Sequence, residues 1–465
     1  MKHIEDLILY NKNEHGYLLS EVPAFLGREE PKDLRRQEGG NLAYPQAVSQ
    51  TYREKLSSCV GALIQAADSY GFEGNLWQSY LTFYLVNHEN AYSIACERRG
   101  EVRGSLADLA SHDFAIFREL FHLDLSEVFH GIQKGILNSI KHYRPSDFDR
   151  GGVSNRIRKE IANLSRALAA AEDDAEFQSL IAAFYQSFGV GKLGLHKAFR
   201  VNEKKSQDIK EAIFHRKSRE FSGETSPWTE TIEPITKIAS VDLSDLVGYE
   251  IAKKKLLDNT LAFLKGLPAN NCLLYGDAGT GKSSSIKAIL NQYYDDGLRM
   301  IEVYKHQFKE LNTIISTIKN RNYRFIIYMD DLSFEDFEID YKYLKAVIEG
   351  GLEKKPENVL IYATSNRRHL IREKFSDKAE LLDDDLHKND TVQEKLSLAA
   401  RFGIPIYFGA PELKEYETIV KVLAQRNGIT LPENELLAKA RQWEISHGGR
   451  SGRTAEQFIQ YISTQ

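Results

Sequence analysis

Hydrophobic residues recur at helical spacing through the first half of the chain. From Met1 to about Glu220 the apolar positions return every three or four residues, and almost none alternate one by one as in a strand. One such set comprises Leu106, Leu109, Phe114, Phe117, Leu120 and Phe121. The pattern predicts a mostly α-helical N-terminal domain at residues 1–220, for which no motif indicates a role.

The pattern changes after a polar and charged segment, in which we place a linker at residues 221–243. Short apolar runs then alternate with amphipathic helical stretches. The runs are Cys272–Tyr275, Met300–Tyr304, Phe325–Met329, Val359–Thr364 and Ile404–Phe408. Nearly unbroken apolar runs are typical of strands that are covered on both faces. Residues 244–409 are therefore predicted to form an α/β core, a five-stranded parallel sheet with helices on both faces.

Beyond Pro411 the alternation stops, and three amphipathic helices are expected to close the chain. Their apolar positions are Leu413, Tyr416, Val420 and Leu423 for the first, Leu436, Leu437, Ala440 and Trp443 for the second, and Phe458 and Ile462 for the third. They predict a small helical lid at residues 410–465.

Composition narrows the class of protein. With 42% hydrophobic and 27% charged residues the chain is typical of soluble globular proteins, and its apolar runs are shorter than the roughly 18 residues of a membrane helix. Charges interrupt the N-terminal segment, so we expect a cytoplasmic protein without a membrane partner. The three cysteines argue against a disulfide framework and a zinc site. A net charge of −5 gives no global attraction to nucleic acid.

The segment GDAGTGKS, Gly276–Ser283, carries the strongest chemical signal. It matches G-x-x-x-x-G-K-[ST] directly after a predicted strand and before a predicted helix. In such a loop glycines let backbone N–H groups point at phosphate oxygens, while Lys282 neutralises their charge and Ser283 can ligate Mg²⁺. The alternative is a tight loop without a ligand. The predicted nucleotide-binding residues are Gly276, Asp277, Ala278, Gly279, Thr280, Gly281, Lys282, Ser283 and Ser284.

Acidic residues follow the strand FIIYM. Ligands of parallel sheets bind at the carboxyl ends of the strands, so this strand places its acids beside the phosphate loop. We predict that Asp330 holds Mg²⁺ together with Ser283, and that Asp331 polarises the attacking water. Nucleotide-hydrolysing enzymes usually have Glu at the position of Asp331. Because the Asp side chain is shorter, Glu335 is an alternative to Asp331. A solvated acidic turn is the alternative to a site.

A further polar residue ends the strand of YATSN, Tyr362–Asn366. There Asn366 can hydrogen-bond a γ-phosphate or the attacking water. Alone it would indicate a turn. The order of phosphate loop, acidic strand and Asn strand is what favours a role at the site.

These motifs together resemble those of the AAA+ ATPases, from about Ser244 to the C-terminus. Nearly the whole chain is also similar to the bacterial family called domain of unknown function 815. GDAGTGKS matches the Walker A motif and FIIYMDD the Walker B motif, and Asn366 falls at the sensor-1 position. DLVGYEIAKKKL resembles the segment that touches adenine, which implies Val247 and Gly248 near the base. Most AAA+ proteins have Glu in place of Asp331, whereas the unknown-function family also has an acidic pair followed by LSFE.

The resemblance implies roles for two arginines. EKLSLAARFGI resembles the stretch that projects an arginine into the nucleotide of a neighbouring subunit, which makes Arg401 the finger candidate. From the residues alone, Arg401 would be an ordinary arginine at a helix C-terminus. HGGRSGRTAEQF resembles the lid helix that carries sensor 2, with Arg453 as the candidate and Arg450 as the alternative.

The function implied is that of an ATP-binding AAA+ protein, an Mg²⁺-dependent ATPase. It would hydrolyse ATP at the subunit interfaces of a homo-oligomer such as a hexameric ring, while its N-terminal domain contacts an unknown protein client. Two alternatives stay open. One is a non-hydrolysing, ATP-dependent assembly switch, and the other is a nucleic-acid-associated ATPase of the initiator or loader type, which the composition does not indicate.

Overall fold

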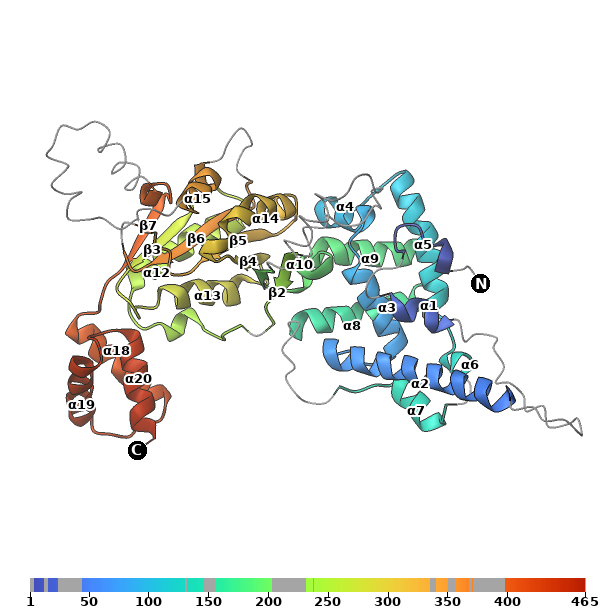
Figure 1. Cartoon of the computed structure of the whole chain (residues 1–465), viewed down its shortest axis with the longest axis horizontal. Helices are drawn as coiled ribbons and strands as arrows, with labels where there is room; N and C mark the ends of the chain where they lie inside the picture. Colours follow the sequence, from blue (N-terminus) through green and yellow to red (C-terminus); the bar gives the residue numbers. More distant parts are fainter. Residues whose placement is uncertain are drawn as a thin grey trace, which may run out of the picture. The chain divides into compact units, whose positions relative to one another are not determined.

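The computed structural model describes residues 4–11, 16–23, 44–129, 132–145, 155–202, 231–236, 238–334, 340–349, 356–367, 370 and 398–464. They divide into an N-terminal unit that extends to His196 and a second unit, the P-loop unit, that begins at Lys197 (Figure 1). Among the described residues, every helix is too short or too polar to span a bilayer.

The N-terminal unit is helical, as predicted. Helix α3 (Leu76–Asn87) is its centre, because every residue from Leu76 to Val86 except Gln78 is buried. Its first turn is capped by Asn75, whose side chain accepts hydrogen bonds from the N–H groups of Trp77 and Gln78. The other helices are α1 (Tyr17–Glu21), α2 (Tyr44–Tyr70), α4 (Ala91–Arg99), α5 (Ser105–Phe121), α6 (Leu125–Val128), α7 (Lys134–Lys141), α8 (Asn155–Ala170), α9 (Asp174–Phe188) and α10 (Gly191–Leu195).

A buried carboxylate ties the N-terminal segment to this unit. The side chain of Asp113 in α5 accepts hydrogen bonds from the backbone N–H groups of Ile8, Leu9 and Tyr10, at 3.0, 2.7 and 2.9 Å. A buried carboxylate requires such partners, because burial without them is strongly unfavourable. The arrangement therefore accounts for a fully buried Asp113 in structural terms.

The P-loop unit contains a seven-stranded sheet. Its strands are β1 (Ala198–Val201), β2 (Ile232–Pro234), β3 (Cys272–Gly276), β4 (Leu298–Glu302), β5 (Arg324–Met329), β6 (Val359–Ser365) and β7 (Ile404–Phe408). The spatial order is β2-β1-β4-β5-β6-β3-β7, and every neighbouring pair is parallel except β1 with β2. The five predicted strands are adjacent, so the predicted α/β core is confirmed.

The predicted strand count of five was too low. Strands β1 and β2 extend the sheet beyond β4, and they have four and three residues. Segments this short give no recognisable alternation of apolar and polar positions, which explains why the sequence did not reveal them. Strand β1 lies within the range assigned to the N-terminal domain, and the exact domain boundaries at 220, 243 and 409 stay predictions.

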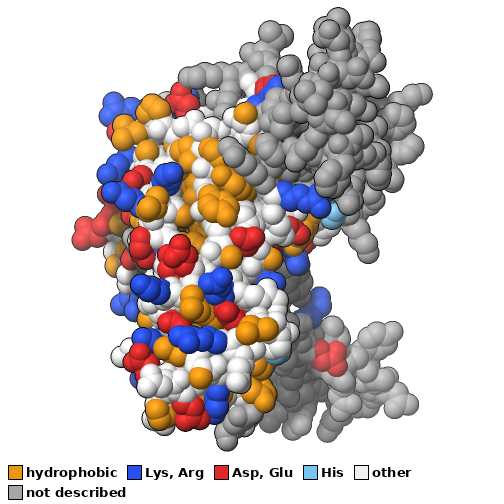
Figure 2. Space-filling view, turned by 90° about the vertical axis from the view of Figure 1, so that its left-hand side faces the viewer, with side chains coloured by type: hydrophobic (Ala, Val, Ile, Leu, Met, Phe, Trp, Pro, Cys, Tyr) orange, Lys and Arg blue, Asp and Glu red, His pale blue; other side chains and the backbone are white. Residues whose placement is uncertain are grey.

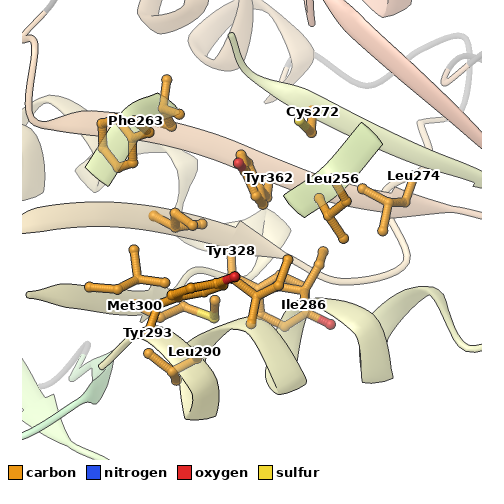
Figure 3. Packing of buried hydrophobic residues seen from close by; sticks show 14 of the residues in the cluster. Leu256, Phe263, Cys272, Leu274, Ile286, Leu290, Tyr293, Met300, Tyr328 and Tyr362 are labelled. Carbon is orange, nitrogen blue, oxygen red and sulfur yellow. The ribbon is translucent and has the colours of Figure 1, made fainter. Parts of the chain in front are cut away.

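Helices cover both faces of the sheet (Figure 1). Helices α12 (Glu250–Leu264) and α13 (Lys282–Tyr293) lie on one face, and α14 (Leu311–Ile318) and α15 (Asp340–Glu349) on the other. On the first face, Ile286 and Tyr293 of α13 lie between the helix and the strands, beside Met300 and Tyr328 (Figure 3). Leu290 belongs to the same buried cluster. Burial of each such side chain stabilises the fold by about 1.5–3 kcal/mol.

A buried polar network holds α12 against the same face. The amide of Asn259 donates to the carbonyl oxygen of Asn270 at 2.8 Å. The hydroxyl of Thr260 lies 2.9 Å from the Tyr362 hydroxyl and donates to the Leu256 carbonyl oxygen at 2.8 Å. Since both hydroxyls have partners, this network fixes the helix without leaving them unsatisfied.

The predicted helical lid follows β7 and consists of α18 (Leu413–Arg426), α19 (Glu433–Ser446) and α20 (Gly452–Ser463). It has its own core, formed by Tyr416, Ile419, Val420, Ala424, Leu436, Leu437, Ala440, Ala455, Phe458 and Ile459. Figure 2 views the side with β7 and the lid: hydrophobic side chains gather in its upper part, and charges of both signs are scattered over the lower part. Strand β7 ends the sheet there, with the Tyr407 side chain 60% exposed.

Candidate functional site

The phosphate loop, Gly276–Gly281, connects the end of β3 to the start of α13. Gly276 has a φ of 136°, and a Cβ atom added there would lie 2.0 Å from the carbonyl oxygen of Phe408 in β7. Gly279 has a φ of 75°. Since L side chains rarely adopt such backbone conformations, the glycines of the motif are required by the shape of the loop.

Lys282 lies beneath the loop, with 7% of the residue exposed. Its ammonium group donates to the carbonyl oxygens of Gly276 and Asp277, at 2.9 and 2.6 Å, and to Asn366 Oδ1 at 3.1 Å. Burial lowers the pKa of Lys282, although nearby aspartates oppose this effect. An ammonium group held by the backbone of the loop is suited to neutralise the charge of a phosphate bound there.

The predicted metal residues lie together. The Ser283 hydroxyl donates to Asp330 Oδ1 at 2.6 Å, although the two residues belong to α13 and to the segment after β5. Burial would raise the pKa of Asp330, but hydrogen bonds from Ser283 and Thr364 outweigh it and hold that pKa below its usual value. The carboxylate is therefore ionised near neutral pH.

The oxygen chemistry of Ser283 and Asp330 fits Mg²⁺. No group of three His, Cys, Asp or Glu side chains in the described part of the chain could hold a metal ion by itself. Mg²⁺ does not need such a cage, because it commonly binds one or two protein oxygens and completes its shell with water and phosphate. This pair is a partial ligand set of that kind.

Asn366 connects Lys282, beneath the phosphate loop, to Asp331, after β5. Its Nδ2 donates to Asp331 Oδ1 at 2.8 Å, while its Oδ1 accepts from Lys282. Asp331 has a φ of 49°, in the left-handed region, which Asp tolerates better than most residues. The strand order explains the meeting: β6 lies between β3 and β5, so the end of β6 lies between the phosphate loop and the acidic pair.

Thr364 was missed by the sequence analysis. Its hydroxyl donates to Asp330 Oδ1 at 2.6 Å and accepts from the backbone N–H of Asp331 at 2.9 Å. A hydroxyl residue two positions before Asn366 in a buried strand was the available signal, but without a structure it is indistinguishable from an ordinary strand threonine. The alternative base, Glu335, lies outside the described residues.

The lid meets the phosphate loop at one of the two arginine candidates. The backbone N–H of Arg453 donates to the Gly279 carbonyl oxygen at 3.2 Å. Arg450 instead pairs with Glu444 in the lid, with Nε and Oε2 3.7 Å apart. The structure therefore brings Arg453 to the loop and gives Arg450 a partner within the lid.

The carboxylate of Asp277 is directed to the lid junction. Its Oδ2 accepts from the backbone N–H of Ala410, between β7 and α18, at 2.7 Å. The backbone N–H of Asp277 donates to the Phe408 carbonyl oxygen at 3.0 Å, so it is directed to β7 and away from a phosphate in the loop. Asp277 thus lies in the loop as predicted, while its side chain fixes the start of the lid segment.

The predicted adenine residues, Val247 and Gly248, lie just before α12 and are half-buried. The side chain of Val247 packs against the lid core. Arg426 of α18 holds the preceding residues by donating to the Ser244 carbonyl oxygen at 2.7 Å. The segment thus lies against the lid.

Arg401 is not brought to the phosphate loop. Its guanidinium forms an ion pair with Glu349 at the end of α15. A contribution to the nucleotide site of the same chain would require a different arrangement, and a role at the site of a neighbouring subunit stays a prediction.

Family comparison agrees with the sequence motifs. The model of the family "Protein of unknown function (DUF815)" matches residues 217–465, more than half of the chain. The chain belongs to this family. The resemblance stated above is thereby confirmed, and the match covers the lid and nearly all of the sheet.

Individual relatives match smaller parts. The replication factor C large subunit of Staphylothermus marinus is 34% identical over 89 residues, 19% of either chain. The Thermotoga maritima RuvB Holliday junction branch migration motor aligns with a TM-score of 0.34 and 16% identity, covering 48% of this chain and 64% of that one. The FIGL-1 AAA domain in complex with ADP aligns with a TM-score of 0.35 and 17% identity, covering 49% of this chain and 75% of that one. The chain thus spans less than two thirds of the first two relatives, and the fold assignment rests on the strand order and the loop.

Proposed function

We propose that the P-loop unit binds ATP with Mg²⁺ and hydrolyses it at the interfaces of a homo-oligomer, in order to remodel or regulate a client that the N-terminal unit contacts. One observation carries the proposal. The Lys282–Asn366–Asp331 chain of hydrogen bonds and the Ser283–Asp330 bond connect three strand ends at a single phosphate loop. A structural role alone gives no reason for a lysine, a hydroxyl, two carboxylates and an amide to converge there.

Each side chain has a role in binding. The loop N–H groups and Lys282 hold the phosphates, and the start of α13 adds the positive end of a helix dipole to the same place. Ser283 and Asp330 hold Mg²⁺, which when bound neutralises charge on the transferring phosphoryl group. Val247 and Gly248 face the base, and Arg453, at the loop, is the candidate to report the nucleotide state to the lid.

Hydrolysis depends on Asp331 and Asn366. Asn366 orients the Asp331 carboxylate through the 2.8 Å bond, and Asp331 accepts the proton of the attacking water. Arg401 of one subunit stabilises the charge that develops at the site of the next. This role rests on the resemblance of the stretch EKLSLAARFGI. Within this chain Arg401 pairs with Glu349, and the ion pair would open as the guanidinium engages the phosphate.

The direct test is nucleotide binding by Lys282→Ala. We expect the variant to lose micromolar affinity for a fluorescent ATP analogue, because a buried cation that faces the phosphates is removed. Lys254→Ala, at an exposed position on α12, is the control and should bind like the wild type. Retained micromolar binding by Lys282→Ala would remove the assignment of the phosphate loop.

Two other functions have support. The short Asp331 favours a switch in which ATP sets an assembly state without turnover, and ATP-dependent oligomer size without phosphate release would indicate it. The identity with the replication factor C large subunit favours a nucleic-acid-associated ATPase. Binding to DNA that weakens steeply with added salt would distinguish this second function, since phosphate contacts release counterions.

A further inference from the structure

Thr364 is in contact with three consecutive residues after β5. Its hydroxyl donates to Asp330 Oδ1 at 2.6 Å and accepts from the N–H of Asp331 at 2.9 Å. Its carbonyl oxygen accepts from the N–H of Leu332 at 2.7 Å. The threonine itself is buried, with 2% exposed, at the sixth position of the fully buried strand β6.

The direction of each hydrogen bond follows from the atoms. A hydroxyl has one hydrogen and two acceptor sites. The N–H of Asp331 can only donate, so the Thr364 oxygen accepts there. The single hydroxyl hydrogen is then available for Asp330, whose Oδ1 also accepts from Ser283. One hydroxyl therefore fixes both acids, the first through its carboxylate and the second through its backbone.

Thr364 holds the backbone at Asp331, where the chain turns away from the direction of β5. Asp331 is one of two described non-glycine residues with a positive φ. Such a conformation is unfavourable by about 1–2 kcal/mol for an L residue, so it persists where other contacts determine it. The hydrogen bonds from Asp331 and Leu332 to Thr364 are two such contacts, and the turn directs the Asp331 carboxylate to Asn366.

We propose that Thr364 is a positioning residue of the ATPase site, which sets Asp330 for Mg²⁺ and Asp331 for the attacking water through one hydroxyl. The inference rests on the proposed function. It predicts that the hydroxyl, and not the shape of the side chain, is what matters. Valine has the same shape without the hydroxyl, and serine has the hydroxyl without the methyl group.

The test uses Thr364→Val and Thr364→Ser in the full chain, with two measurements. The first is the affinity for a fluorescent ATP analogue with Mg²⁺ and with EDTA. Thr364→Val should bind like the wild type in EDTA, and should lose about tenfold or more of the gain in affinity that Mg²⁺ gives, the effect expected when a hydrogen bond to a charged group is lost. The second is turnover, where kcat should fall about 10- to 100-fold. Thr364→Ser should stay within about threefold of the wild type in both.

Thr260→Val is the matched control, because Thr260 is also a buried threonine with two hydrogen-bond partners but lies away from the acids. It should lower the melting temperature and leave the Mg²⁺ dependence unchanged. Wild-type Mg²⁺ dependence in Thr364→Val, or the same loss in Thr260→Val or Thr364→Ser, would overturn the proposal. If the wild type binds Mg²⁺ and ATP without turnover, hydrolysis fails as the proposed function, while the Mg²⁺ measurement still decides the role of Thr364.

Discussion

At the scale of single residues, the site depends on hydroxyl groups as much as on charges. Asp330 lies at the rim of the sheet and receives hydrogen bonds from Ser283 and Thr364, both at 2.6 Å. Hydrogen bonds to an ionised acceptor are roughly twice as strong as those between neutral groups. They keep Asp330 charged and hold its Oδ1 in place. Asp331 instead accepts from the amide of Asn366, so the two acids have different hydrogen-bond partners.

The pKa of Asp330 gives a prediction for stability against pH. Its folded-state pKa is lowered, so its hydrogen bonds stabilise the folded state fully above the unfolded value, about 3.9, and this contribution is lost as pH falls through the folded value. The difference in melting temperature between the wild type and Asp330→Asn should be constant from about pH 5 to 7 and shrink below about pH 4. Melting curves across this range check it, and a difference that widens in acid would contradict it.

At the scale of elements, the site depends on the close approach of β3 to β7. Gly276 ends β3 and pairs with Phe408, and the N–H of Asp277 donates to the Phe408 carbonyl oxygen at 3.0 Å. A Cβ atom at Gly276 would overlap that same carbonyl group, which belongs to the backbone and cannot rotate away. The loop and the last strand are therefore fixed together.

Gly276→Ala should destabilise the P-loop unit by about 2–4 kcal/mol, through backbone strain and overlap together. Gly428→Ala is the matched control, because Gly428 also has a positive φ, 66°, and has open space around its Cβ position. It should cost about 1 kcal/mol, from backbone strain alone. Urea unfolding followed by circular dichroism compares the free energies of unfolding of the two variants. Equal decreases in this free energy would contradict the prediction, because they would mean that the overlap with β7 costs nothing.

The sequence predicted those elements whose signals are strong and local. Strands β3, β5 and β6 are nearly continuous apolar runs, and the phosphate loop has fixed spacing, so their meeting at one edge could be expected from parallel topology. Strands β1 and β2 are too short for a periodic signal. Thr364 escaped notice because its partners are 33 and 34 residues away, and a hydrogen bond over that distance has no sequence pattern.

The predicted role of Arg401 involves a second subunit, which the structure of one chain does not contain. The sequence stretch around it resembles a finger region, yet its partner in the structure is Glu349. Presentation of Arg401 to the nucleotide of a neighbouring copy is what the resemblance implies. This role is therefore predicted from resemblance and not from the physics of a single chain.

At the scale of the whole molecule, the lid and the core are coupled at the phosphate loop. The backbone N–H of Arg453 donates to the Gly279 carbonyl oxygen. The side chain of Asp277 accepts from the backbone N–H of Ala410, where the chain enters the lid. Arg426 adds a third link through Ser244. Because these hydrogen bonds link the loop to the start of the lid and to the first turn of α20, we expect a change in the loop on binding phosphate to be transmitted to the lid.

Asp331 and Arg401 are proposed to act on ATP in an assembly of several copies. Steady-state ATP hydrolysis across a series of protein concentrations tests it, with the wild type, Asp331→Asn, Arg401→Ala and an equal mixture of the two variants. Turnover per chain should rise with concentration. It should fall by about 100-fold or more in Asp331→Asn, because a general base is lost, and by about 1,000-fold or more in Arg401→Ala.

The mixture should partly regain activity, because the variant that keeps Arg401 can serve the intact Asp331 of its neighbour. A control for assembly is the size of each variant with ATP, which should match that of the wild type. Tight ATP binding without phosphate release at any concentration, or no recovery in a mixture that assembles normally, would contradict the account.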